Sequence, residues 1–161
     1  MAKYYLLLFS ICMFFSCGPS KNNYKSSKKN KYSTLTKQLI NHAKSFEGTA
    51  YLYGGSTSKG MDCSGLIYTA YKSVDYNIPR TSLAMYRDGA NVKVKHIKNG
   101  DLLFFKTSKK RNSKVNHVGL VTSIRKGEIY FIHSTTSKGV ITSVLSNSYW
   151  NKAFVGAKRY L

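Results

Sequence analysis

The chain has 161 residues, of which 26 are lysine or arginine and only six are acidic, giving a formal net charge of +20 at neutral pH. So large an excess of positive charge favours an acidic partner or environment: nucleic acid, an anionic membrane or a carboxylate-rich polymer. No signature of a nucleic-acid-binding module occurs, so we expect no nucleic-acid partner and favour the polymer.

Residues 1–17 have the organisation of an export signal. Lys3 precedes a nearly unbroken apolar run that ends at Phe15, too short for a bilayer span of about 20 residues. Ser16 then precedes Cys17, which resembles the cleavage position of a bacterial lipoprotein signal. We therefore expect Cys17 to be the acylated first residue of the mature protein. The alternative is an ordinary secretory signal in which Cys17 occurs by chance.

The rest of the chain divides into a linker and one domain. Residues 18–33 are rich in lysine, serine and asparagine and have no aliphatic residue, which predicts a flexible basic linker. Residues 34–161 are long enough to bury a core, and we expect them to form a single monomeric domain.

The first half of this domain has the period of helices. Ser33 or Thr34 can cap a helix that ends at about Phe46, and an irregular loop is expected over residues 49–60. A buried helix of about three turns is predicted to begin at Cys63. The apolar stripe of the first helix contains Leu35, Leu39, Ile40, Ala43 and Phe46.

The second half has the period of strands. After a short helix over about 79–87, apolar segments alternate with turn residues. Helices followed by strands predict an α+β domain in which an antiparallel sheet of five to six strands packs on the helices. The predicted strands cover residues 101–105, 117–121, 129–133, 140–142 and 154–160.

Cys63 is the only cysteine outside the export segment, which contains Cys12 and Cys17. It has no partner for an intramolecular disulfide and cannot belong to a multi-cysteine zinc site. A helix N-terminus and a nearby imidazolium both lower the pKa of a thiol, so we expect Cys63 to be a nucleophile that is largely thiolate near neutral pH. The alternative is an inert cysteine of the core.

Two histidines are suited to assist this cysteine. His117 begins one predicted strand and His133 ends the next, so an antiparallel hairpin would bring both to one end of the sheet. One could then face Cys63 as a base while the other orients it. A metal site made by Cys63 and the two histidines is an alternative. His42 and His96 receive no role.

Six motifs occur in an order that resembles the NlpC-type cell-wall cysteine peptidases, a papain-like family. The resemblance covers residues 35–161 and is strongest to the short lipoprotein murein endopeptidases of Gram-negative bacteria; Tyr53 stands where many relatives have tryptophan. The motifs are Tyr51–Gly55, Asp62–Leu66, Pro79–Ser82, Gly100–Phe105, Asn116–Gly119 and Phe131–Ser134.

The resemblance implies a papain-like fold and a role for each site residue. It implies that Cys63 is the nucleophile, His117 the general base and acid, and His133 the polar third member. Tyr51 would support the oxyanion together with the backbone N–H of Cys63. Asp62 and Ser64 would contact the substrate. No metal and no cofactor are expected.

The reaction implied by the resemblance is hydrolysis of an amide in the peptide stems or cross-links of peptidoglycan. The cross-link amide to diaminopimelate is favoured over the γ-D-glutamyl bond within a stem. The protein would act at a membrane facing the periplasm, with the outer membrane favoured. Two alternatives are an acyltransferase with the same Cys/His site and a non-catalytic peptidoglycan-binding module.

Overall fold

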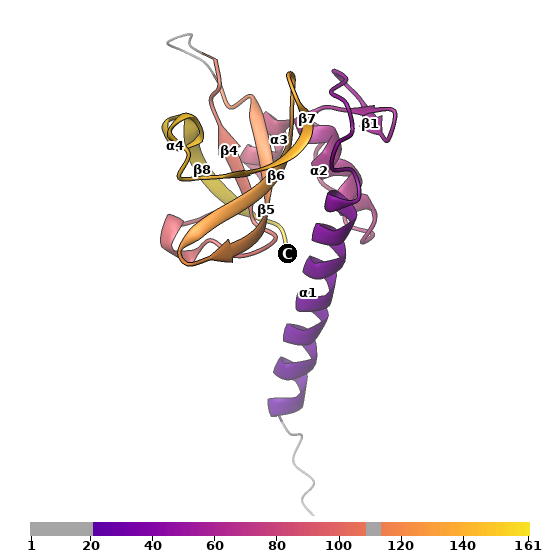
Figure 1. Ribbon diagram of the computed structural model, residues 1–161. Helices are drawn as coiled ribbons and strands as arrows, with labels where there is room; N and C mark the ends of the chain where they lie inside the picture. Colours follow the sequence, from indigo (N-terminus) through magenta and orange to yellow (C-terminus); the bar gives the residue numbers. More distant parts are fainter. Residues whose placement is uncertain (1–20, 109–113) are drawn as a thin grey trace, which may run out of the picture.

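The computed structural model describes residues 21–108 and 114–161 (Figure 1). The predicted export signal and Cys17 lie outside these residues. No helix within the described ranges is long and apolar enough to cross a membrane.

The first helix, α1 (Lys21–Lys44), is longer than the sequence predicted. Its contact with the domain is the expected apolar stripe, in which Leu39 and Ala43 are fully buried. It begins at Lys21 rather than at Ser33 or Thr34, so residues 21–33 are helical instead of forming a flexible linker. No proline or glycine interrupts residues 20–47, and a helix anchored at one end extends by one hydrogen bond per residue. The N-terminal part of α1 projects away from the domain (Figure 1).

The second helical region supplies two short helices. As predicted, α2 (Cys63–Lys72) begins at Cys63 and α3 (Ser82–Asp88) follows the proline of the third motif. The loop between α1 and α2 is less irregular than expected, because it contains the two-residue strands β1 (Ser56–Thr57) and β2 (Gly60–Met61). The helix α4 (Ser148–Ala153) was not predicted.

A six-stranded sheet forms the second half, within the predicted range of five to six strands. Every neighbouring pair is antiparallel, and the order is β3-β8-β4-β5-β6-β7. The three-residue edge strand β3 was not predicted, and a 3₁₀ turn over Val94–His96 follows it. The strands are β3 (Ala90–Val92), β4 (Leu102–Phe105), β5 (His117–Arg125), β6 (Glu128–Thr135), β7 (Gly139–Val144) and β8 (Phe154–Arg159).

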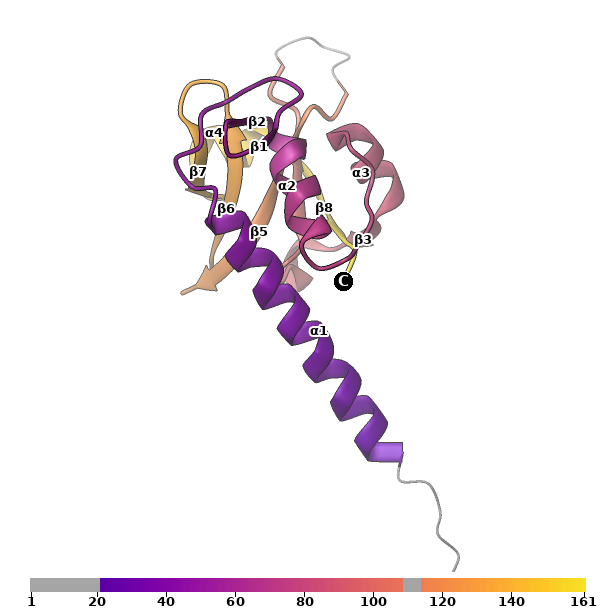
Figure 2. The same cartoon turned by 90° about the vertical axis from the view of Figure 1, so that its right-hand side faces the viewer.

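The two faces of the sheet belong to different cores, because successive side chains of a strand point to opposite faces. In β4, Phe104 packs into the core shared with α1 and α2, whereas Phe105 packs with Phe131 and Trp150. Helices α1, α2 and α3 lie on one side of the sheet and α4 lies on the other (Figures 1 and 2). The start of β5 therefore lies between the core of the helices and a separate aromatic cluster.

Candidate active site

Cys63 occupies the first position of α2. Asp62 is the N-cap: its backbone is extended, and its carboxylate accepts a hydrogen bond of 2.6 Å from the N–H of Gly65. The Cys63 side chain is half-buried, and its sulfur contacts the backbone N–H groups of Val118, Ser64 and Cys63 itself. The cap thus fixes the helix start, and the helix start directs the thiol at the beginning of β5.

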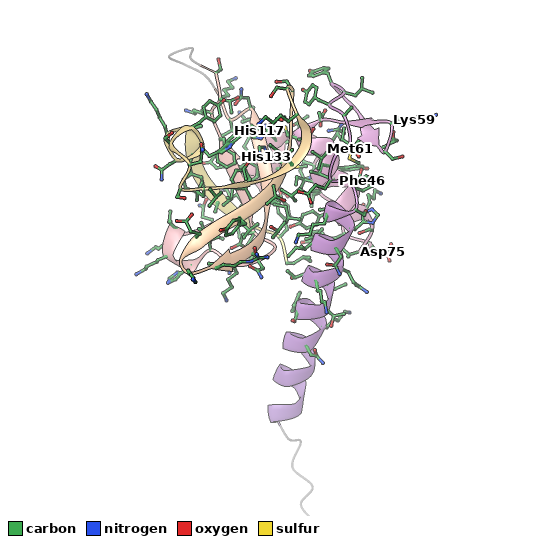
Figure 3. The ribbon with its side chains drawn as sticks, in the orientation of Figure 1. Phe46, Lys59, Met61, Asp75, His117 and His133 are labelled. Carbon is green, nitrogen blue, oxygen red and sulfur yellow. The ribbon has the colours of Figure 1, made fainter. Side chains whose placement is uncertain are left out.

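The two histidines lie where the predicted hairpin required them. Strands β5 and β6 are antiparallel and pair Leu120 with Ile132, so the start of β5 lies beside the end of β6. His117 Nε2 and His133 Nδ1 are 2.9 Å apart, and both rings are buried (Figure 3). Because Nε2 of His117 is used in this pair, Nδ1 is the ring nitrogen left for another partner, and His117 lines the same cavity as Cys63.

An aromatic cluster encloses the imidazole pair. The indole of Trp150, from α4, stacks on His117 with ring centroids 5.2 Å apart and meets His133 edge-on at 4.5 Å. Phe131 packs on His133 at 4.7 Å, and Phe105 lies 5.9 Å from His117. Sequence analysis assigned Trp150 no role, since the short helix that carries it was not predicted. The cluster shields the histidines from water.

Ser143 is a second residue of the site that sequence analysis missed. Its hydroxyl lies 2.9 Å from Nε2 of His133, on the side of that ring away from His117. Ser143 belongs to β7, in a segment with no motif around it, so only the strand pairing brings it to the histidines. The three side chains His117, His133 and Ser143 form a continuous chain of polar contacts.

The protonation state differs from the one the sequence suggested. Burial, together with the charge of Asp62, raises the pKa of Cys63 to about 11, against the opposing effect of the backbone N–H groups around it. Burial also lowers the pKa of His117 to about 4 and that of His133 to about 3, the second helped by the neighbouring imidazole. No imidazole is among the hydrogen-bonding contacts of the thiol in the described part of the chain. Burial therefore favours a neutral thiol and neutral imidazoles in this conformation over the expected thiolate–imidazolium pair.

Cys63 lies where two cavities meet. Tyr51, Cys63 and Asn116 line both of them. The first, which we call the histidine arm, has a volume of about 370 Å³ and is also lined by Thr107, His117, Ser134, Thr135, Thr136, Ser137, Tyr149 and Trp150. The second, the carboxylate arm, has a volume of about 530 Å³ and is also lined by Tyr53, Gly54, Asp62, Ser64, Arg80, Thr81 and Ser82. A chain running through both arms would pass over the sulfur.

Arg80 organises the carboxylate arm, a role that sequence analysis missed although the residue lies in a quoted motif. Its guanidinium donates to both carboxylate oxygens of Asp62, at 3.0 and 3.1 Å, and to the Ser64 hydroxyl at 2.9 Å. It also donates to the carbonyls of Gly54 and Gly55. Burial opposes ionisation of Asp62, but the bonds from Arg80 and Gly65 hold the pKa of this carboxyl below its usual value.

Asp62 and Ser64, expected to contact substrate, line the arm but are held by this network. Their polar atoms bond to Arg80 and to each other, with Ser64 donating to Asp62 at 3.1 Å. A Cβ on Gly65 would come within 2.0 Å of the Gly55 carbonyl, so glycine permits the loop before β1 to approach α2 closely. These contacts hold the loop that carries Tyr51 against the nucleophile helix.

Tyr51 lies at the junction of the two arms. It is half-buried, and burial together with the nearby Cys63 and Asp62 raises the pKa of its phenol. A phenol that stays protonated can donate a hydrogen bond to a developing oxyanion. Within the described residues, no three histidine, cysteine or acidic side chains are grouped so as to hold a metal ion.

The chain is similar to known proteins over most of its length. The sequence pattern described as the NlpC/P60 family matches residues 48–159. The chain is 32% identical over 158 residues to the probable endopeptidase NlpC of Escherichia coli K12, covering 98% of this chain and 99% of that protein. It is 39% identical over 138 residues to the murein DD-endopeptidase MepH of the same strain, covering 83% of this chain but 49% of that protein.

A solved structure is similar throughout the domain. An NlpC/P60 family protein from Bacillus cereus superposes with a TM-score of 0.70 and 35% sequence identity. The match covers 78% of this chain and 40% of the Bacillus protein, so the likeness concerns this domain alone.

Proposed function

Because this chain belongs to the NlpC/P60 family, we propose that it is a cell-wall cysteine endopeptidase that hydrolyses amide bonds in the peptide stems or cross-links of peptidoglycan. One observation carries the proposal. Cys63 begins a helix at the junction of two cavities and shares one of them with His117, whose ring is paired with His133.

In the proposed reaction, His117 acts as general base and then as general acid. The Cys63 sulfur attacks the amide carbonyl carbon while Nδ1 of His117 takes the thiol proton. The negative charge that develops on the carbonyl oxygen is stabilised by the N–H of Cys63 and the Tyr51 hydroxyl. His117 returns the proton to the departing amine as the C–N bond breaks, leaving a thioester. Water then attacks the thioester, with His117 again taking a proton, and releases the carboxylic acid and the thiol.

The neutral resting state suits this sequence of proton transfers. A neutral imidazole can accept the thiol proton, whereas an imidazolium cannot, and the low pKa of His117 keeps it neutral near pH 7. His133 supports this base by forming a hydrogen bond with Nε2 of His117, the ring nitrogen that does not take the thiol proton. In this proposal the thiolate forms as the substrate reacts.

We favour the cross-link amide as the bond that is cut. The relative with 39% identity is named a murein DD-endopeptidase, and the domain's excess of lysine and arginine suits an acidic polymer. Asp62 and Ser64 remain proposed substrate contacts through the faces that line the carboxylate arm.

The envelope location rests on the N-terminus and on the relatives. We propose that Cys17 is acylated and anchors a monomeric enzyme to a membrane facing the periplasm, with the outer membrane favoured. The helix α1 is about 36 Å long at about 1.5 Å per residue, and its projecting N-terminal part would then separate the domain from the anchor. Cys17→Ala should abolish acylation and move the protein out of the membrane fraction. Membrane association that survives this change would contradict the anchor.

The catalytic proposal is tested by digesting purified sacculi with the full mature protein in detergent and identifying the products by mass spectrometry. The wild type should release muropeptides cut at the cross-link, and Cys63→Ala should release none. His133→Ala should retain partial activity, because an orienting group contributes less than the nucleophile. Amide products formed from an added amine would favour an acyltransferase. Binding to sacculi without any cleavage would favour a non-catalytic wall-binding module.

A further inference from the structure

We propose that Ser143 is a positioning residue that sets the tautomer of His133 and, through it, the tautomer of His117. The proposal rests on the endopeptidase function above and adds one residue to the hydrogen-bonded chain that positions His117. Its basis is the 2.9 Å contact between the Ser143 hydroxyl and Nε2 of His133.

The strand register, and not a loop, delivers this hydroxyl. Strands β6 and β7 pair Phe131 with Ser143 and His133 with Ile141, so Ser143 is the diagonal neighbour of His133 on the same face of the sheet. Diagonal neighbours lie within reach of a long or aromatic side chain. The position of Ser143 is therefore set by backbone hydrogen bonds on both strands.

The proton positions along the chain are coupled. For Nδ1 of His117 to accept the thiol proton, the neutral ring must carry its hydrogen on Nε2 and donate it to His133 Nδ1. His133 Nδ1 must then be the acceptor, so His133 carries its own hydrogen on Nε2. That hydrogen points at Ser143, whose oxygen can accept it. This arrangement of hydrogens satisfies all three residues and leaves the base ready. In the reverse arrangement the Ser143 hydroxyl could donate to Nε2 of His133, but His117 would then have to carry its hydrogen on Nδ1, where the nearby thiol is only a weak acceptor.

The aromatic rings that pack on His133 offer no substitute for the hydroxyl. The ring is fully buried, and its other described neighbours include Phe131 and Trp150, neither of which has a strong acceptor. Every buried side-chain nitrogen and oxygen in the described part of the chain has a partner. Loss of the Ser143 hydroxyl would leave the N–H of His133 without one.

An unsatisfied N–H would favour the opposite arrangement. With its hydrogen on Nδ1, His133 would donate to Nε2 of His117, and His117 would then carry its hydrogen on Nδ1. Nδ1 of His117, the nitrogen proposed to take the thiol proton, would then be a donor and could not act as the base. Ser143 thereby biases a tautomer equilibrium without touching the substrate.

The experiment separates the hydroxyl from the shape of the side chain. Ser143→Ala removes the hydroxyl, while Ser143→Thr and Ser143→Val are of nearly equal size and differ by the hydroxyl alone. Thr142→Val is the control, because Thr142 is an exposed neighbour on the same strand with its side chain on the other face. Full-length protein labelled with ¹⁵N-histidine is studied at pH 7, where both imidazoles are neutral, by the ring-nitrogen chemical shifts and by muropeptide release.

In the wild type, His117 and His133 should both carry hydrogen on Nε2. Ser143→Ala and Ser143→Val should shift the hydrogen of both rings to Nδ1 and lower kcat by about ten- to a hundredfold with little change in KM, the effect of one unsatisfied buried donor. Ser143→Thr should restore the wild-type tautomer and most of kcat, and Thr142→Val should change neither.

Three results would overturn the proposal: an unchanged tautomer in Ser143→Val, equal activities of the valine and threonine variants, or a tautomer shift that leaves kcat unaltered. Failure of the proposed function looks different. In that case Cys63→Ala would match the wild type in the sacculus assay, whatever the histidine tautomers are.

Discussion

The histidine arm and the carboxylate arm both bring polar groups to Cys63, but they keep them in different charge states. In the histidine arm, His117 and His133 are buried among aromatic rings, and burial favours their neutral forms. In the carboxylate arm, Asp62 is ionised because Arg80 bonds both of its oxygens. One arm controls charge by excluding water, and the other by pairing opposite charges.

This difference matters to the thiol between them. The charge of Asp62 raises the pKa of Cys63, so an uncompensated carboxylate would oppose formation of the thiolate still more. Arg80 offsets that charge and also ties the loop of Gly54 and Gly55 to the nucleophile helix. The histidine arm therefore moves the proton, while the carboxylate arm holds the geometry.

The largest effect should follow from breaking the histidine arm at His117. His117→Ala removes the group that accepts and returns the proton, so muropeptide release should fall by about 10²–10⁴-fold, the usual contribution of general acid–base catalysis. His96→Ala is the matched control, because that histidine is exposed and remote from the cavity lining. Comparable losses in the two variants would show that His117 acts through stability instead.

The state of the thiol can be measured by alkylation with iodoacetamide across pH. A pKa raised from 9.0 to about 11 predicts about a hundredfold less thiolate at pH 7 than an unperturbed cysteine. The alkylation rate of Cys63 should therefore be low near pH 6 and rise steadily through pH 9. A fast plateau at pH 6 would instead demonstrate the thiolate–imidazolium pair that the sequence suggested.

Breaking the carboxylate arm should have a smaller effect on activity, and the chain offers a close control. Arg80→Met leaves Asp62 without its partner and frees the loop of Tyr51, so kcat should fall by about ten- to a hundredfold through misplacement of reacting groups. Arg159→Met breaks a similar pair, in which Arg159 donates to Asp101 at 2.6 and 2.7 Å and is about as exposed as Arg80.

Both arginine variants should lose about 1–2 kcal/mol of unfolding free energy in urea titrations, because each leaves a mostly buried carboxylate without its charged partner. The loss should not be larger, because each guanidinium is about one-third exposed and its charge is screened by water. Arg159→Met should keep the wild-type kcat. An equal loss of kcat in both variants would contradict a specific role for the carboxylate arm.

A last prediction concerns stability against pH. Both buried histidines have folded-state pKa values below the ordinary 6.5, so the unfolded chain binds protons first as the pH falls. Their contribution to stability is complete above about pH 6.5 and is lost as the pH falls toward 4, at up to about 1.4 kcal/mol per pH unit for each histidine. Urea midpoints at pH 7 and pH 5 should show this fall. His133→Gln should reduce it and His96→Gln should not.

The fold was largely predictable because its main elements have local signals. The apolar stripe of α1, the helix start at Cys63 and the antiparallel hairpin of β5 and β6 follow from side-chain period and turn residues. The misses lack such a signal. The strand β3 and the helix α4 are too short to show a period, and residues 21–32 of α1 contain no aliphatic residue that could form an apolar stripe.

By itself the sequence determined which residues could do chemistry: one cysteine beyond the export segment, at a helix start, and two histidines at neighbouring strand ends. Only the tertiary structure decided which groups complete the site and how they are charged. Arg80, Ser143 and Trp150 come from separate elements, and strand pairing and packing bring them to the cleft. The neutral thiol and imidazoles follow from loss of water around them, and desolvation depends on every neighbouring element at once.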